Sequence, residues 1–174
     1  MSELPQIFRD ENNSCQIDFS KAVWATDQLH DIFHSAKVAI LHDVDFIAET
    51  EDKLLLVEYK NANLPDAANP CAFKPREDKK LNNVAAKYYD SMYFLQAIER
   101  GRYKRKIYVY ILECQNGDMV LRNQVKALLA GRLPFLLQKQ NALSENMIDR
   151  LEVVSVVEWN EKYVGFPLKL LKST

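Results

Sequence analysis

The sequence predicts an α/β protein in which helices flank a mixed central sheet, and three segments carry this prediction. Residues 53–60 (KLLLVEYK) are apolar on both faces of an extended chain, which is typical of a central strand. Residues 80–99 repeat apolar side chains at helical spacing, and residues 107–114 (IYVYILEC) form a second strand-like run. A strand, a helix and another strand in succession favour an α/β sandwich with a mixed sheet.

The chain has the length of one domain, and residues 1–174 are taken as a single unit. Its 174 residues suffice to bury a core but not to build two ordinary domains. Hydrophobic residues make up 48% and charged residues 27%, which is the balance of a soluble globular protein. With only 4 glycines and 6 prolines, a long disordered linker is not expected.

The remaining elements are predicted from apolar periodicity, caps and turn residues. Gly101 is expected to end the long helix, and Asn116-Gly117 marks a turn. In order along the chain, the other elements are an irregular arm or short strand over 1–18, a helix capped by Ser20 over 21–36, an extended stretch over 38–41 and 44–48, an acidic turn over 49–52, a loop over 61–78, a helix over 122–133, a strand over 153–159 and a Leu- and Lys-rich tail.

Three charged residues stand out because they interrupt apolar strands. Asp45 lies between Val44 and Phe46 in one predicted strand. Glu58 and Lys60 lie two apart in the next strand, so their side chains point to the same face. Charged groups in buried strands are costly to desolvate and need a partner, for which a divalent metal ion is well suited.

The types of these residues fit metal-assisted chemistry on a phosphate. Asp45 and Glu58 can hold Mg²⁺, which takes oxygen ligands and keeps some of its waters, and Mn²⁺ is expected to substitute. The backbone carbonyl of Tyr59 is a further candidate ligand. Such a metal lowers the pKa of bound water and neutralises charge on the phosphate under attack. Lys60 can stabilise developing negative charge or help to orient and deprotonate the attacking water. The predicted catalytic residues are therefore Asp45, Glu58 and Lys60.

This arrangement resembles the motif of the PD-(D/E)XK nuclease superfamily. An aspartate in one strand is followed by twelve residues (46–57) that include a turn, and then by Glu-x-Lys in a neighbouring strand. Asp45, Glu58 and Lys60 take the motif positions, and Val44 stands where the motif has proline. The proline has no chemical role, so this departure is a mild one.

The resemblance covers about residues 20–114 and implies a restriction-endonuclease-like αβββαβ core, with 115–174 as C-terminal additions. It also implies metal-dependent hydrolysis of phosphodiester bonds, usually in DNA, and Lys60→Ala is then expected to abolish cleavage. Many members carry a further metal-binding acid on the first helix. Asp27 is the candidate for that acid, and Asp31 is the second choice.

Nucleic-acid contacts would have to come from local basic patches, because the net charge of the chain is −1. One patch precedes or begins the long helix, the other follows that helix, and Lys87 lies on the helix itself. Taken alone, a run of charges more often marks a solvated loop or helix end. The candidate nucleic-acid contacts are Lys74, Arg76, Lys79, Lys80, Lys87, Arg102, Lys104 and Arg105.

Two alternatives from other functional classes stay open at this point. The chain could be a catalytically idle member of the same fold that binds nucleic acid or protein. It could also be an interaction domain whose helix presents Tyr89, Tyr93 and Phe94 to a partner, including a second copy of itself. His30 and His34, four apart, are interpreted as a surface pair rather than a zinc site, because no third ligand is evident.

The expected compartment is the cytoplasm. The first 16 residues lack the apolar core of a signal peptide, and no run of residues is long and apolar enough to span a bilayer. Cys15, Cys71 and Cys114 are odd in number and widely spaced, which favours a reducing environment over a disulfide framework.

Overall fold

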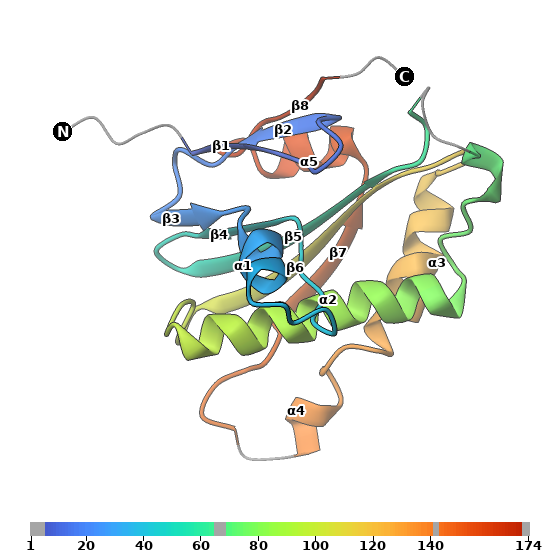
Figure 1. The fold of residues 1–174 in the computed structure, drawn as a ribbon. Coiled ribbons are helices and arrows are strands. Elements are labelled where there is room, and N and C mark those ends of the chain that lie inside the picture. Colours follow the sequence, from blue (N-terminus) through green and yellow to red (C-terminus); the bar gives the residue numbers. More distant parts are fainter. Residues whose placement is uncertain (1–5, 65–68, 141–142, 172–174) are drawn as a thin grey trace.

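A computed structural model of the chain describes residues 6–64, 69–140 and 143–171 (Figure 1). The strands are β1 (Ile7–Arg9), β2 (Cys15–Asp18), β3 (Trp24–Thr26), β4 (Phe46–Glu49), β5 (Lys53–Asn61), β6 (Arg105–Glu113), β7 (Arg150–Val154) and β8 (Leu168–Leu170). The helices are α1 (Leu29–Ser35), α2 (Asp78–Ala97), α3 (Met119–Ala130), α4 (Leu137–Gln140) and α5 (Val156–Lys162), with a short 3₁₀ turn η1 (Pro70–Ala72).

The main sheet is mixed, as predicted, and its strand order is β3-β4-β5-β6-β7. The β3–β4 and β4–β5 pairs are antiparallel, whereas the β5–β6 and β6–β7 pairs are parallel. Parallel neighbours need a long connection, and α2 supplies the one between β5 and β6. Strand β5 has a neighbour on both edges, so the prediction of a central strand over 53–60 is confirmed.

The two faces of this sheet pack against different layers (Figure 1). Helices α1, α2 and α3 cover one face, and Leu54 and Leu56 of β5 point into that core. The other face packs against α5 and a separate antiparallel sheet of order β1-β2-β8, and Leu55 and Val57 point there. Because side chains alternate along a strand, Glu58 continues the Leu54–Leu56 series and faces α2.

The predicted helix over 21–36 is wrong in its first half. Residues 24–26 form strand β3 on the edge of the sheet, and only Leu29–Ser35 is helical. A hydrogen bond from Gln28 N to Thr26 Oγ1 turns the chain between the two elements. Of the apolar residues predicted to share the buried face of this helix, Leu29 and Phe33 are buried, but Ile32 is 40% exposed, and Ala25 belongs to β3, where it pairs with β4.

The predicted strand over 153–159 is also too long. Strand β7 ends at Val154, and a capping box at Ser155 starts α5. Ser155 Oγ accepts a hydrogen bond from Glu158 N, and the Glu158 carboxylate accepts one from Ser155 N. The apolar residues that follow Ser155 therefore belong to a helix, in which Trp159 is fully buried.

Other boundaries differ by smaller amounts. The predicted helices over 80–99 and 122–133 correspond to α2 and α3, and the predicted strand over 107–114 corresponds to β6. The extended stretch over 38–48 contributes only β4, because residues 38–45 form no strand. Parts of the N-terminal arm and of the tail pair as β1, β2 and β8.

Gly101 is the position where the backbone most clearly requires glycine. Its φ is +70°, and a Cβ there would collide with the Leu54 side chain. We expect Gly101→Ala to lower the free energy of unfolding by about 2 kcal/mol, through backbone strain and overpacking. Urea denaturation measures the change. Gly131→Ala is the matched control, because a Cβ there meets only Leu128 O at 3.7 Å and should change stability by less than about 0.5 kcal/mol. Equal stability of the two variants would contradict this account of the turn.

Candidate functional site

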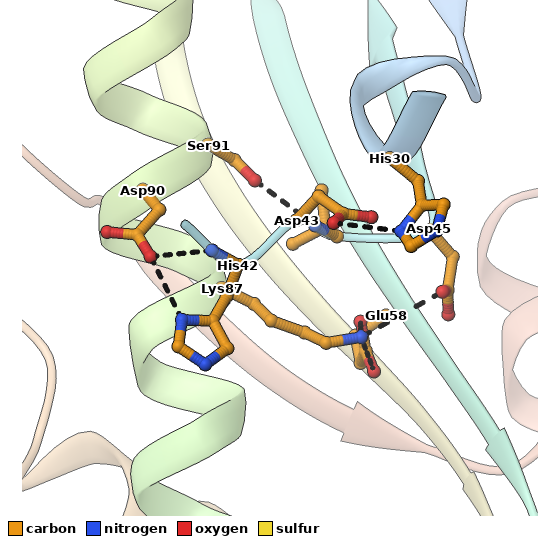
Figure 2. A network of polar contacts seen from close by, with 9 residues as sticks. His30, His42, Asp43, Asp45, Glu58, Lys87, Asp90 and Ser91 are labelled. Atoms are coloured by element: carbon orange, nitrogen blue, oxygen red, sulfur yellow. Dashed lines mark hydrogen bonds and ion pairs between the residues drawn. The ribbon is translucent and has the colours of Figure 1, made fainter. Parts of the chain in front are cut away.

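Asp45 and Glu58 come together because β4 and β5 are antiparallel neighbours (Figure 2). Phe46 pairs with Val57, so the same register carried back by one residue places Asp45 opposite Glu58. Asp45 Oδ2 accepts a 2.7 Å hydrogen bond from Tyr59 N, which fixes this carboxylate just before β4 begins. The sequence prediction that these two acids converge is therefore in agreement with the geometry.

The third charged group at this point is Lys87 of α2, which reaches down onto the sheet (Figure 2). Its Nζ lies 2.7 Å from Glu58 Oε1 and 2.9 Å from Oε2, and 4.0 Å from Asp45 Oδ1. The side chains of Glu58, Lys87 and Asp45 are 9%, 21% and 23% exposed, so the three groups interact with little screening by water. The ammonium thus bridges two carboxylates that face one another.

Helix α2 also holds the segment that leads into Asp45. One turn beyond Lys87, Asp90 Oδ2 accepts hydrogen bonds from His42 N (2.8 Å) and from His42 Nδ1 (3.2 Å). Ser91 Oγ, which is fully buried, accepts a hydrogen bond from Val44 N at 3.1 Å. Residues 42–45 do not pair with a neighbouring strand. The contacts with Asp90 and Ser91 therefore take the place of backbone hydrogen bonds within a sheet and fix the position of Asp45.

The charges at the site strongly perturb each other. Burial raises the pKa of Glu58 to about 8, and the Asp45 carboxylate adds to the rise while Lys87 opposes it. Burial also raises the pKa of Asp45, against the opposing effects of Lys87 and the Tyr59 amide. Burial lowers the pKa of Lys87, but the Glu58 and Asp45 carboxylates outweigh it, so that this pKa is raised overall. Two buried carboxylates therefore share one ammonium, and their raised pKa values express the cost of charging both.

A pocket of about 470 Å³ opens beside these groups, and most of its charged side chains are acidic. Asp27 lies in its wall, so this candidate for the further acid does border the site, although it precedes α1 instead of lying on it. Asp31 lies in the wall as well. His30 contacts Asp43 at 3.3 Å, and its ring is 6.1 Å from that of His34. Both histidines are exposed, in agreement with a surface pair.

Lys60 does not join this group of charges. Its side chain is exposed, and its Nζ lies 5.6 Å from the centre of the Phe73 ring, in the loop before α2. Strand geometry places Lys60 on the same face as Glu58, but β5 ends at residue 61, where the lysine can turn outward. Sequence reasoning gave Lys87 only a contact with nucleic acid. Its spacing of three from Val84 and four from Ser91 could have placed it on the sheet-facing side of the helix.

The two predicted basic patches lie at opposite ends of β5 and β6. The cations of residues 74–80 lie beside the start of α2, at the end of β5 that holds Glu58 and Lys60. Lys80 Nζ lies 5.9 Å from the centre of the Phe73 ring, which Lys60 also contacts. Arg76 donates a 2.9 Å hydrogen bond to Gln124. All four cations of this patch, Lys74, Arg76, Lys79 and Lys80, are exposed, and within the described ranges none of them forms an ion pair with an acid.

The cations at the other end of the strands are largely neutralised. Lys104 pairs with Glu49 at 3.0 Å, and Arg105 pairs with Asp52 at 2.6 Å. Arg102 stacks on the Tyr103 ring, with its guanidinium carbon 5.0 Å from the ring centre. This second patch therefore stabilises the turn between β4 and β5 and lies far along the strands from Glu58.

The residues present fit a hard divalent cation. Asp45 Oδ1 accepts no hydrogen bond from the described part of the chain, which leaves it available as a ligand. The amide and carbonyl of one strand residue point to the same edge, so the Tyr59 carbonyl is expected on the side of Asp45. Within the described ranges, no three His, Cys, Asp or Glu side chains form a group that could hold a metal ion. Mg²⁺ commonly needs only one or two carboxylates, because it keeps several waters.

The aromatic side chains of α2 differ in their surroundings. Tyr93 is 70% exposed, whereas the Tyr89 hydroxyl donates a hydrogen bond to Arg132 O and Phe94 packs edge-on against Phe33. Only Tyr93 is therefore largely free of contact with the rest of the described chain.

Comparisons of the chain with protein-family models, with curated proteins and with solved structures found no match. Among the helices described, none combines the length and apolar character needed to cross a membrane.

Proposed function

We propose that the protein is a metal-dependent nuclease of the PD-(D/E)XK kind that hydrolyses phosphodiester bonds, with DNA as the favoured substrate. The observation that carries the proposal is the convergence of Asp45 and Glu58 from neighbouring strands with a lysine amine between them, beside an acidic pocket that Asp45 and Lys87 line. Two buried carboxylates that share a single ammonium are suited to binding a further cation, because that cation lowers the cost of charging both.

The order of elements supports the same family. An antiparallel β3-β4-β5 meander, a crossover helix α2 and a parallel strand β6 resemble the βββαβ part of the restriction-endonuclease-like core. The first helix departs from the pattern, because α1 lies between β3 and β4 instead of before the first strand. This fold assignment is part of the proposal, and within it residues 115–174 are C-terminal additions.

Each residue of the site then has a distinct role. Asp45 and Glu58 would hold Mg²⁺ or Mn²⁺ together with the Tyr59 carbonyl, and Asp27 borders the same pocket as a further acid. When bound, the metal would supply a water of lowered pKa and neutralise charge on the phosphate. The Tyr59 amide keeps Asp45 oriented, and the buried strands limit the access of bulk water. Once released from Glu58, the Lys87 ammonium can stabilise negative charge that develops on the phosphate.

The cations beside the start of α2 would position the nucleic acid. They are exposed, lack acidic partners in the described chain and lie at the same end of β5 as the site. Such contacts fix a phosphate backbone without reading sequence. Of the residues predicted to contact nucleic acid, we retain Lys74, Arg76, Lys79 and Lys80 and assign Lys60 to this group.

A cleavage assay with lysine variants tests the proposal. We expect the purified protein to cut plasmid or linear DNA with Mg²⁺ or Mn²⁺ and not with EDTA. The geometry favours Lys87 over Lys60 as the lysine of the reaction, so Lys87→Ala should lower kcat about 100-fold. Lys60→Ala should mainly raise KM, by less than about tenfold. The opposite order would return the catalytic role to Lys60, and metal-independent cleavage would contradict the proposal as a whole.

One observation favours a second candidate, the catalytically idle nucleic-acid-binding module. Both oxygens of Glu58 contact Lys87, which is the arrangement of a stabilising ion pair in a site that no longer needs a metal. This candidate predicts binding of DNA without cleavage under any metal condition, and the same assay separates the two.

A further inference from the structure

A second hollow of different chemical character shares the residue His42 with the acidic pocket. This hollow has a volume of about 530 Å³. Among the described residues, His42 is the one that lines both the hollow and the acidic pocket. The residues that line the hollow are His42, Lys79, Lys80, Asn82, Asn83 and Ala86.

The charge of the second hollow suits an anion. No acid is among the residues that line it, whereas the first pocket is bordered by several. Lys79 and Lys80 are exposed, and within the described ranges neither forms an ion pair with an acid. The four polar residues from α2 lie in the first two turns of a 20-residue helix, where the helix dipole adds positive potential. The amide groups of Asn82 and Asn83 can donate further hydrogen bonds.

The ring of His42 is held in one orientation by Asp90. The Asp90 carboxylate accepts hydrogen bonds from both His42 N and His42 Nδ1, at 2.8 and 3.2 Å. Because Nδ1 donates to this carboxylate, Nε2 is the nitrogen left to meet a ligand, and it donates when the ring is protonated. The side chain of His42 is 42% exposed, so a ligand can reach it.

We propose that His42 and the hollow formed with Lys79 and Lys80 bind a nucleic-acid phosphate next to the one attacked at Asp45 and Glu58. The inference rests on the proposed nuclease function and adds a path for the substrate. One strand would run from the acidic pocket, across His42, to the first turns of α2. His42 contacts the substrate, and Asp90 is a positioning residue that sets the orientation of its ring.

Binding of a fluorescein-labelled DNA oligonucleotide in EDTA, where metal-dependent cleavage cannot proceed, tests the proposal. His42→Ala and Lys80→Ala should each raise Kd about tenfold, the effect of losing one charge-assisted contact. Lys80→Ala should also lower the salt dependence of log Kd by about 1. His34→Ala is the matched control, because His34 lies on α1 and lines neither hollow, and its Kd should stay unchanged.

Histidine NMR signals of the wild-type protein give a second measurement that does not depend on a variant folding. On addition of the oligonucleotide, the ring signals of His42 should shift and those of His34 should not. In Asp90→Asn, DNA should still bind, but the ring nitrogen shifts of His42 should respond differently because Nδ1 has lost its charged acceptor. Binding that leaves the His42 signals and both affinities unchanged would overturn this inference while the nuclease proposal stands. Absence of DNA binding altogether would overturn both.

Discussion

Replacement of Glu58 by glutamine is expected to lower the rate of metal-dependent DNA cleavage about a thousandfold. The change keeps the shape of the side chain but removes one of two carboxylates in the candidate metal site. A bound metal is worth several kcal/mol of charge stabilisation in the transition state, and about 4 kcal/mol corresponds to three orders of magnitude in rate. Initial rates at saturating Mg²⁺ and at raised Mn²⁺ measure the loss.

The matched control for this experiment is Glu51→Gln. Glu51 is an exposed acid in the turn between β4 and β5, at the end of the strand away from the site. Its loss removes the same charge and should change the rate less than about twofold, since surface substitutions away from a site have small effects. If Glu58→Gln and Glu51→Gln cleave equally well, Glu58 is not part of the catalytic site.

Lys87→Met is expected to destabilise the fold by an amount that grows with pH. The variant leaves Glu58 and Asp45 buried without their ammonium partner, and breaking a buried ion pair costs about 3 kcal/mol or more when both charges are present. We expect a loss of about 3 kcal/mol at pH 9 and about 1 kcal/mol or less at pH 5. Urea denaturation at the two pH values measures the free energy of unfolding.

The sign follows from the raised pKa of Glu58. Its ordinary value is 4.5 and burial raises its pKa to about 8, so the folded protein holds an extra proton between those values and loses stability as pH rises through them. Lys87 opposes this rise in the pKa of Glu58. Without Lys87 the pKa is higher still, so the free energy of unfolding of the variant goes on falling to higher pH. Lys79→Met, an exposed lysine on the same helix, is the control and should change stability by less than about 0.5 kcal/mol at either pH. A loss for Lys87→Met that is equal at pH 5 and pH 9 would contradict the assigned electrostatics.

The sequence predicted those parts of the molecule that local pattern determines. The apolar run of β5, the periodic stripe of α2 and the run of β6 define three adjacent elements, and their order favours the mixed sheet. Glu58 and Lys60 follow from the alternation of a strand. The position of Asp45 required only that the turn over 49–52 place β4 beside β5, which the register confirms.

The parts that failed depend on contacts between segments far apart in the chain. Strand β3 forms because an edge of β4 is available for pairing, and no local signal in residues 24–26 reports that edge. The small sheet pairs residues 15–17 with residues 168–170, a contact that spans nearly the whole chain. The capping box at Ser155 is the exception, because its Ser-x-x-Glu pattern is visible in the sequence and was outweighed by the run of valines.

The two lysines, Lys60 and Lys87, show the same difference between features set by local pattern and features set by long-range contacts. Strand geometry can say which face Lys60 points to, but not that the strand ends one residue later and lets the side chain turn toward Phe73. Lys87 meets Glu58 only because α2 crosses back over β5, a contact between residues 29 apart in sequence. Long flexible side chains are therefore the least predictable members of such a site, because their partners depend on where a strand ends and on which helix crosses it.

Calorimetric titration of Mn²⁺ into the metal-free protein tests the central claim most directly, because it asks whether Asp45 and Glu58 bind a cation at all. We expect saturable binding to the wild type and to Glu51→Gln, and no such binding to the double variant Asp45→Asn, Glu58→Gln. The double variant should fold, since amides replace acids of nearly the same shape, and circular dichroism checks this. Mn²⁺ binding that is the same in wild type and double variant would contradict the assignment of these two carboxylates as the metal site.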